Sequence, residues 1–244
     1  MPMTNASSVI AHRGGAAEAV ENSLEAFSHA IAVGADWIEF DVQLSKDCVP
    51  IVVHDAKTDR FWKGCSRNFS DLNFNQIKKL ITKEHLALTI PSLDEALALT
   101  AGKIGIVLDI KGDSTSNYKL FVKEILSVLS QYEESLQDLC ILSSFEPAIL
   151  EEIRLQAPNK KICLIIEDEV FLRYADALKP EFLSIHIDLV TKSFVDNAHE
   201  RGIKVWAWTV NRKNRIKECL NMGVNAIITD WPRMMRSLIQ SLET

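Results

Sequence analysis

Short apolar runs alternate with amphipathic stretches along most of this chain. The apolar runs have the length of buried strands, whereas the stretches between them repeat apolar residues every three or four positions, as helices do. The expected strands are residues 9–11, 37–42, 104–110, 139–143, 162–166, 182–187, 204–209 and 226–229. The expected helices are residues 23–33, 92–99, 118–131, 147–156, 170–177, 193–201, 212–222 and 233–241. Strand and helix therefore alternate eight times.

Eight strand–helix units in 244 residues predict an α/β fold, the TIM barrel. A doubly wound open sheet is the alternative, but the first expected strand is not followed by the Gly-rich motif of dinucleotide-binding sheets. Residues 55–91 are too many for a connecting loop and contain a helical pattern near 75–81. We therefore expect one barrel domain over residues 1–244, with 55–91 as a small insertion over the barrel mouth after the second strand.

The second expected strand leads into a hairpin. Residues 36–44 alternate apolar with polar, so Glu39 and Asp41 share one face of the strand. After a turn at 46–49, residues 50–55 are expected to form the return arm. If Asp47 and Cys48 are the two turn residues, Asp41 lies opposite His54, and a slip of one residue would turn His54 away.

Composition limits the classes of protein that this chain can represent. A net charge of −6 and the lack of a basic tract argue against nucleic-acid binding. The sequence shows no signal-peptide pattern and no apolar run long enough to span a bilayer, so we expect a soluble cytoplasmic enzyme. The five cysteines are odd in number and lack close metal-type spacing, which favours reduced, buried thiols over disulfides or a zinc site. The oligomeric state does not follow from the sequence.

Polar residues follow or end several of the expected strands, where TIM barrels carry their chemistry. These are His12-Arg13, Glu39 with Asp41, Asp109 with Lys111, Ser143-Ser144, His186, Trp208 and Asp230. Crowded carboxylates repel each other unless a proton or a cation lies between them, and Mg²⁺ and Ca²⁺ prefer oxygen ligands. Two imidazoles, His12 and His54, can transfer protons near neutral pH. The set therefore indicates metal-assisted chemistry on a phosphate.

The same residues lie in longer motifs that resemble the glycerophosphodiester phosphodiesterase family. The resemblance is strongest over residues 11–14 (AHRG), 21–27 (ENSLEAF), 34–47 (GADWIEFDVQLSKD) and 52–55 (VVHD). It continues through residues 90–95, 108–111, 143–145, 208–211 and 223–232 and so covers nearly the whole chain. The resemblance implies a TIM barrel with a small insertion, one divalent metal ion, and hydrolysis of glycerophosphodiesters to sn-glycerol 3-phosphate and an alcohol.

Roles for individual residues follow from matching the family's motifs. The resemblance implies His12 and His54 as the acid/base pair, Glu39, Asp41 and Asp109 as the ligands of one Mg²⁺ or Ca²⁺ ion, and Arg13 and Lys111 as the phosphate-binding cations. Alternation places Trp206 and Trp208 on one face, so Trp208 is expected to cover the glycerol of a small-molecule phosphodiester. Glu21 is expected either to orient His12 or to cap the helix that begins near Ser23.

The chain departs from the family pattern at Val20, Cys48 and Asp109, and three alternative functions stay open. The family usually has Glu where this chain has Asp109, which shortens a metal ligand by one methylene, and Cys48 replaces a turn glycine. The alternatives are a related enzyme acting on lysophospholipids, one acting on sugar phosphodiesters, and a barrel of low activity that binds a phosphorylated ligand. An exposed apolar patch around Phe61 and Trp62 would favour a substrate with an acyl chain.

Overall fold

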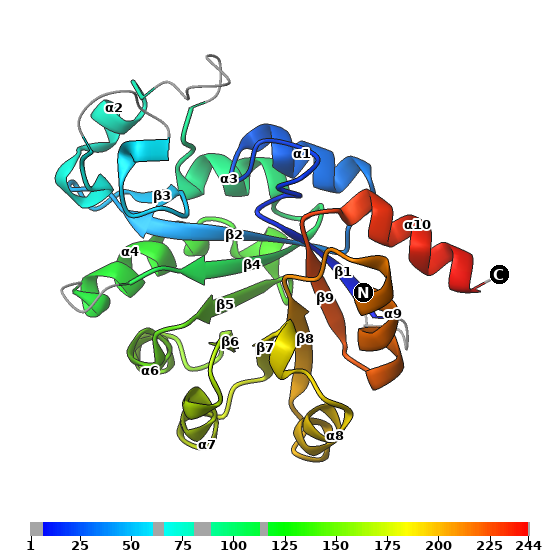
Figure 1. Cartoon of the computed structure of the whole chain (residues 1–244). Helices are drawn as coiled ribbons and strands as arrows, with labels where there is room; N and C mark the ends of the chain where they lie inside the picture. The colour runs from blue at the N-terminus through cyan, green and yellow to red at the C-terminus, as the bar shows by residue number, and fades with distance from the viewer. Residues whose placement is uncertain (1–6, 61–65, 81–88, 113–116, 244) are drawn as a thin grey trace.

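The computed structural model describes residues 7–60, 66–80, 89–112 and 117–243, and within them eight parallel strands close into a barrel (Figure 1). The strands are β1 (Ser8–His12), β2 (Trp37–Leu44), β4 (Gly105–Ile110), β5 (Cys140–Ser144), β6 (Lys161–Ile166), β7 (Phe182–His186), β8 (Lys204–Trp208) and β9 (Ala226–Thr229). Each strand pairs with the next around the ring, and β1 pairs with both β2 and β9, which closes it. The predicted TIM barrel is confirmed, and the open sheet is excluded.

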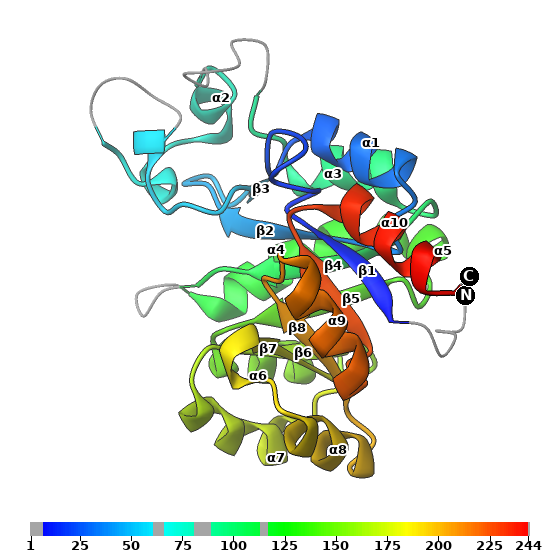
Figure 2. The ribbon, with the colours of Figure 1, turned by 45° about the vertical axis from the view of Figure 1, so that its right-hand side comes forward.

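Helices surround the barrel, and one follows each strand or hairpin (Figures 1 and 2). They are α1 (Leu24–Ala32), α3 (Leu93–Thr100), α4 (Tyr118–Ser130) with the short α5 (Glu133–Leu136), α6 (Pro147–Gln156), α7 (Ala175–Leu178), α8 (Lys192–Glu200), α9 (Lys213–Met222) and α10 (Pro232–Glu243). The expected helix at 170–177 is divided between the 3₁₀ helix η3 (Glu169–Tyr174) and α7.

Local sequence explains where several helices begin. The Ser23 hydroxyl accepts a hydrogen bond from the backbone N–H of Ala26 and so caps α1. Ser92 and Glu95 form a reciprocal capping box at α3, in which each side chain accepts a hydrogen bond from the other residue's backbone N–H. These caps fix the amino-terminal ends of the helices that follow β1 and the hairpin of β2 with β3 (Pro50–Val52).

Side chains alternate between the helix-facing and interior sides of each strand. The barrel interior holds an apolar cluster of Ile10, Val107, Ile141, Cys163, Phe182, Trp206, Ala226 and Ile228. Two residues further along the same strands, polar side chains occupy the same interior face: His12 after Ile10, Asp109 after Val107, Ser143 after Ile141 and Ser184 after Phe182. The period of two therefore brings polar groups from separate strands together at the carboxyl end of the barrel.

The hairpin forms as expected, but its predicted register is wrong by one residue. Strand β3 (Pro50–Val52) pairs antiparallel with β2 so that Val42 lies opposite Val52, and the backbone N–H of Val53 donates to the carbonyl of Asp41. The loop has three residues rather than two, and Cys48, its last residue, has a φ of 62°. A three-residue loop that ends in the left-handed conformation is a common hairpin connection and shifts the pairing by one residue.

His54 reaches the barrel mouth in spite of this register, because the chain leaves the ladder after Val52. The Gln43 side-chain amide holds the departing segment by donating to the carbonyl oxygens of Val53 at 3.1 Å, His54 at 2.7 Å and Asp55 at 3.0 Å. The bend after β3 therefore brings His54 to the pocket, as the predicted register would have done.

The segment between β3 and α3 has its described parts beside the arrowhead end of β2 (Figures 1 and 2). Its described parts include the 3₁₀ helices η1 (Thr58–Arg60) and η2 (Phe69–Asp71) and the helix α2 (Phe74–Ile77). A small apolar cluster holds these parts on the hairpin: Ile51, Val53, Phe69, Leu72, Ile77, Leu80 and Ile90. The helix is shorter than the expected 75–81, whose residue 81 lies outside the described residues, as do Phe61 and Trp62. An insertion covering the barrel mouth stays a prediction.

Three of the cysteines, Cys140, Cys163 and Cys219, are buried free thiols, as the composition predicts, and Cys48 is a free thiol that is half-buried. Cys65 lies outside the described residues. Burial raises the pKa of Cys140 to about 12 and that of Cys219 to about 11, so these thiols stay protonated at neutral pH. Among the described helices, none has the length and apolar character needed to cross a bilayer.

Candidate active site

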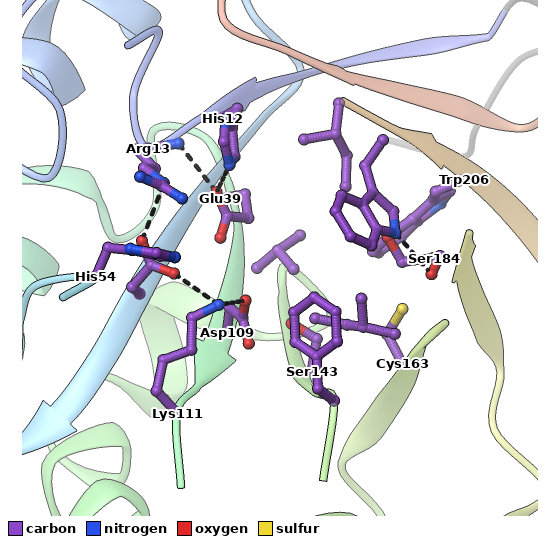
Figure 3. A pocket seen from close by; sticks show the side chains of 16 residues that line it. His12, Arg13, Glu39, His54, Asp109, Lys111, Ser143, Cys163, Ser184 and Trp206 are labelled. Carbon is purple, nitrogen blue, oxygen red and sulfur yellow. Dashed lines mark hydrogen bonds and ion pairs between the residues drawn. The ribbon is translucent and has the colours of Figure 1, made fainter. Parts of the chain in front are cut away.

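A pocket of about 90 Å³ opens at the carboxyl ends of the strands. One side carries charged groups, and the opposite side carries mainly apolar groups, with Trp206 and Cys163 among them (Figure 3). The lining consists of His12, Arg13, Glu39, Asp41, His54, Val107, Asp109, Lys111, Ser143, Phe145, Cys163, Ile165, Ser184, Trp206, Trp208 and Ile228. Glu21 is the one residue of the predicted site set outside this lining.

Glu39, Asp41 and Asp109 form a buried carboxylate triad. The ladder between β2 and β4 places Asp41 directly beside Asp109, and one oxygen from each of the three residues lies within 4.8 Å of the others. Burial and the neighbouring Asp41 raise the pKa of Glu39 to about 7, and burial raises that of Asp109 as well. Among the described residues, no hydrogen-bond donor meets the buried Oδ1 of Asp109. An unpartnered buried oxygen in an all-oxygen cluster suits a hard divalent cation.

Two cations lie against this triad (Figure 3). Lys111 Nζ lies 2.5 Å from Asp109 Oδ2 and 3.1 Å from Asp41 Oδ1, and Arg13 Nε lies 3.3 Å from Asp41 Oδ2. Burial lowers the pKa of Lys111, but the carboxylates of Asp109 and Asp41 outweigh burial and hold this pKa above its usual value. Burial likewise raises the pKa of Asp41, yet Lys111 and Arg13 lower it overall. Asp41 is therefore the carboxylate that remains ionised most readily.

The turn after β1 explains why a glycine follows Arg13. Arg13 has a φ of 51° and Gly14 a φ of 85°, and the backbone N–H of Arg13 donates to Glu39 Oε2 at 2.9 Å. A Cβ on Gly14 would lie 2.7 Å from the Cβ of Ala26 and 2.9 Å from the ring of Phe27. Helix α1 thus packs directly on the turn that carries Arg13, and a side chain at position 14 would disturb this packing.

His12 is held by a carboxylate that the sequence analysis left without a role. Its Nδ1 lies 2.6 Å from Asp230 Oδ1, and its Nε2 lies 4.0 Å from Glu39 Oε2. Asn211 fixes Asp230 by donating from Nδ2 to Oδ2 at 2.5 Å. Burial lowers the pKa of His12, but the hydrogen bond to Asp230 and the charge of Glu39 raise it overall. The imidazole is therefore oriented with Nε2 toward the triad, as a proton-transferring histidine requires.

His54 occupies the other side of the triad and is more exposed than His12. Its Nδ1 lies 2.8 Å from Asp55 Oδ1, so the adjacent residue supplies its orienting carboxylate. The two imidazoles therefore share one arrangement, in which a carboxylate holds Nδ1.

Asn22 is a further residue that the sequence analysis did not select. Its Nδ2 donates to Asp41 Oδ2 at 2.8 Å, and its Oδ1 accepts from the backbone N–H of Asp41 at 3.2 Å. Asn22 has a φ of 54°, a conformation that asparagine tolerates better than most residues. Its position in the family-like ENS motif beside Glu21 was the available signal.

Neither expected role of Glu21 is observed. Ser23, not Glu21, caps α1, and the Glu21 carboxylate pairs with two arginines rather than with His12. Arg13 Nη1 donates to Glu21 Oε1 at 2.9 Å, and Arg60 donates to both oxygens at 2.5 and 2.7 Å. Glu21 therefore links Arg13 to the 3₁₀ helix η1, whose Arg60 lies 39 residues from Glu21 in the sequence.

Trp208 and Phe145 both line the apolar side of the pocket. Its indole N–H donates to the carbonyl of Ser184 at 3.0 Å, and its ring meets Phe145 edge to face at a centroid distance of 5.4 Å. Lys111 Nζ lies 4.8 Å from the centroid of the Phe145 ring. As alternation predicts, Trp206 and Trp208 both face the interior, with Trp206 buried and Trp208 at the mouth.

The profile of the glycerophosphoryl diester phosphodiesterase family matches residues 12–234. A glycerophosphodiester phosphodiesterase from Caldanaerobacter subterraneus subsp. tengcongensis is 31% identical over 240 residues, covering 95% of this chain and 97% of the relative.

Two solved structures have the same fold. One, from Silicibacter pomeroyi, gives a TM-score of 0.90 at 23% identity and covers 100% of this chain and 95% of that chain. The other is a phosphodiesterase from Oleispira antarctica in complex with the product sn-glycerol-3-phosphate. It gives a TM-score of 0.88 at 27% identity, with 96% of each chain covered. Since the family profile covers residues 12–234, which include the triad and both histidines, the chain belongs to the glycerophosphoryl diester phosphodiesterase family.

Proposed function

We propose that this protein is a metal-dependent phosphodiesterase that hydrolyses glycerophosphodiesters to sn-glycerol 3-phosphate and an alcohol. One observation carries the proposal: a single pocket contains the carboxylate triad, two cationic side chains, and two imidazoles whose Nδ1 atoms each contact a carboxylate. The family match and the Caldanaerobacter relative support the same reaction class.

Glu39, Asp41 and Asp109 are the residues that would hold one divalent ion, Mg²⁺ or Ca²⁺. The fit rests on three buried carboxylates that can act as oxygen ligands, and on the Oδ1 of Asp109, which has no hydrogen-bond partner among the described residues. Although Asp109 is one methylene shorter than the usual Glu, its carboxylate still lies within the cluster. When bound, the ion supplies positive charge that polarises the phosphate.

The side chains around the triad would perform the rest of the reaction. Arg13 and Lys111 bind the non-bridging phosphate oxygens, the first as a fork and the second as a point charge. One imidazole of the His12 and His54 pair removes a proton from the attacking oxygen, and the other protonates the leaving alkoxide. Trp208 packs against the carbon atoms of the glycerol and excludes water from that side.

The proposed function is tested by measuring release of glycerol 3-phosphate from glycerophosphocholine and glycerophosphoethanolamine with Mg²⁺, Ca²⁺, Mn²⁺ or a chelator. We expect release with at least one metal and none with chelator. Equal release with chelator would refute the metal requirement, and no release with any metal would favour a binding role. Lysophosphatidylcholine and a sugar phosphodiester, measured in the same series, test the other two alternatives.

We further propose a cytoplasmic location and a small-molecule phosphodiester as the partner. The free thiols of Cys140, Cys163 and Cys219 support a reducing compartment. The pocket volume of about 90 Å³ supports a small substrate rather than a macromolecule.

Glu21→Gln is expected to lower kcat/KM by about 5- to 30-fold, because removing a charged hydrogen-bond partner costs about 1–2 kcal/mol of phosphate positioning. Glu21 holds the guanidinium of Arg13 at 2.9 Å, so its loss would act through Arg13. Steady-state kinetics on glycerophosphocholine measure the effect. Glu25→Gln, which removes an exposed carboxylate from the first turn of α1, is the matched control and should leave kcat/KM unchanged. Equal values for both variants would contradict a positioning role for Glu21.

A further inference from the structure

A second compartment of about 570 Å³, the outer compartment, adjoins the active-site pocket and shares His54 and Lys111 with it. It lies between the β2–β3 hairpin, the segment around η2 and the start of α4. Its described lining is Gln43, Leu44, Ser45, His54, Ala56, Asn68, Ser70, Asp71, Lys111, Gly112, Asn117, Leu120 and Phe121. The active-site pocket lies deeper, inside the barrel, and is the inner pocket of the pair.

The two spaces differ in size and in chemistry. The inner pocket is about 90 Å³, and Trp206 and Ile228 are among the apolar side chains that line it. The outer compartment is several times larger, and its lining includes five neutral polar side chains: Gln43, Ser45, Asn68, Ser70 and Asn117. One space therefore suits a short carbon chain, and the other suits a hydrophilic group of variable size.

Asp71 gives the outer compartment its charge. Apart from the shared His54 and Lys111, Asp71 is the one charged side chain among the described residues that line it. Lys111 is already engaged by Asp109 and Asp41. Asn68 donates to Asp71 Oδ2 at 3.0 Å, which orients the carboxylate at the end of η2. The outer part of the compartment therefore favours a positive charge.

A phosphodiester carries two ester arms, and the reacting centre lies where the two spaces meet. Arg13, Lys111 and the triad fix the phosphate at this junction if the proposed function is right, and the assignment of the two arms rests on that function. His12 lines only the inner pocket, whereas His54 lines both spaces. Figure 3 shows His54 and Lys111 across the pocket from Trp206, on the side where the outer compartment begins. An arm that passes His54 therefore enters the outer compartment.

We infer that the outer compartment is the subsite for the alcohol arm of the substrate and that Asp71 makes it favour a small alcohol bearing an ammonium group. The glycerol arm then occupies the inner pocket beside Trp208, and His54 stands next to the oxygen of the departing alcohol. The neutral polar lining admits hydroxylated alcohols as well, while the carboxylate of Asp71 adds a preference for positive charge.

The inference is tested by comparing kcat/KM for glycerophosphoethanolamine, whose alcohol carries a positive charge, with that for glycerophosphoglycerol, whose alcohol is neutral. Asp71→Asn should reduce the ratio of the two values by about two- to fivefold, the range expected for an exposed charge pair, and Asp71→Lys should reduce it further. Adding salt should lower the ratio in the wild type and leave it nearly constant in Asp71→Asn. Asp138→Asn, which removes an exposed carboxylate next to the amino end of β5, should leave the ratio at the wild-type value.

A steric variant tests the location independently of charge. Ser70 is an exposed residue of the outer compartment, so Ser70→Trp should fill part of this space without disturbing the core. We expect Ser70→Trp to lower kcat/KM for glycerophosphoinositol at least fivefold more than for glycerophosphoethanolamine. If the wild type hydrolyses these substrates but the Asp71 and Ser70 variants change all of them equally, the subsite is refuted while the proposed function stands. If the wild type releases glycerol 3-phosphate from none of them, the proposed function fails first.

Discussion

His12→Ala is expected to lower kcat by about 10²- to 10⁴-fold, the range that general acid–base catalysis contributes. The geometry around the ring is the reason: Asp230 holds Nδ1 at 2.6 Å, and Nε2 points toward the carboxylate triad, 4.0 Å from Glu39. Water in the vacated space would lack both the orientation and the proton affinity of the imidazole. Single-turnover or steady-state release of glycerol 3-phosphate at saturating substrate measures the loss.

The pH dependence of the rate separates proton transfer from packing. A proton-transferring His12 contributes one limb of the pH profile of kcat, so His12→Ala should lose that limb as well as amplitude. Asp230→Asn keeps the imidazole but removes the carboxylate charge beside Nδ1, and we expect an intermediate loss of kcat and a lower pKa for the limb assigned to His12. A variant with unchanged profile shape and lower amplitude would indicate a structural role.

His29→Ala provides the matched control for this experiment. His29 is a partly buried histidine that pairs with Glu18 at 2.6 Å, as His12 pairs with Asp230, but it lies on α1 outside the pocket. Its removal should leave kcat unchanged. His54→Ala should resemble His12→Ala in size. Substantial turnover in either pocket variant, with thermal unfolding like that of the wild type, would overturn the assignment of the acid/base pair.

The interior residues of the barrel could be predicted from the sequence because a strand has a period of two. Ile10 and His12, or Val107 and Asp109, must share a face whatever the rest of the chain does. Once strand and helix alternate eight times, the carboxyl ends of all strands lie together, and the polar residues there form one site. The local sequence pattern therefore predicted most of the residues that line the pocket.

Contacts between distant segments could not be predicted in this way. Asp230 lies 218 residues from His12, and only the closure of the barrel by β1 and β9 makes them neighbours. Arg60 reaches Glu21 from the start of the segment after β3, where the sequence predicted no helix or strand before residue 75. The register of the hairpin was predicted wrongly for another reason. The last residue of the loop, Cys48, adopts the left-handed conformation that glycine usually occupies, and nothing in the sequence therefore indicated a three-residue loop in place of the expected two-residue turn.

Glu39→Gln is expected to stabilise the metal-free protein by about 3 kcal/mol at pH 8, while it removes metal-dependent activity. In the folded protein the pKa of Glu39 is raised from 4.5 to about 7 by burial and by the neighbouring Asp41. A carboxyl whose folded pKa is raised stabilises the fold below its unfolded pKa, and this stability is lost as the pH rises through the folded pKa. The free energy of unfolding of chelator-treated wild type should therefore fall between pH 4.5 and about 7.

Other groups at the site alter this curve in ways that can be distinguished. Asp109 also has a raised pKa and adds to the fall, whereas the pKa of Asp41 is lowered, so its stabilisation is lost only in acid below 3.8. His12 has a pKa raised above 6.5, so its contribution is lost only above that pH. The fall between pH 4.5 and 6.5 thus reports the two buried carboxyls, and Glu39→Gln should remove the part that Glu39 contributes.

Urea unfolding at several pH values, with chelator or with Mg²⁺ or Ca²⁺, measures this effect. A bound cation neutralises the triad, so saturating metal should raise the stability of the wild type most above pH 7 and raise that of Glu39→Gln much less. Glu25→Gln, with an exposed carboxyl, should follow the wild type under all conditions. If the free energy of unfolding in chelator depended on pH in the same way for Glu39→Gln and the wild type, the ionised form of Glu39 would not destabilise the folded protein, and the prediction would be wrong. If the prediction holds, the same repulsion that weakens the metal-free fold is the driving force for binding the cation.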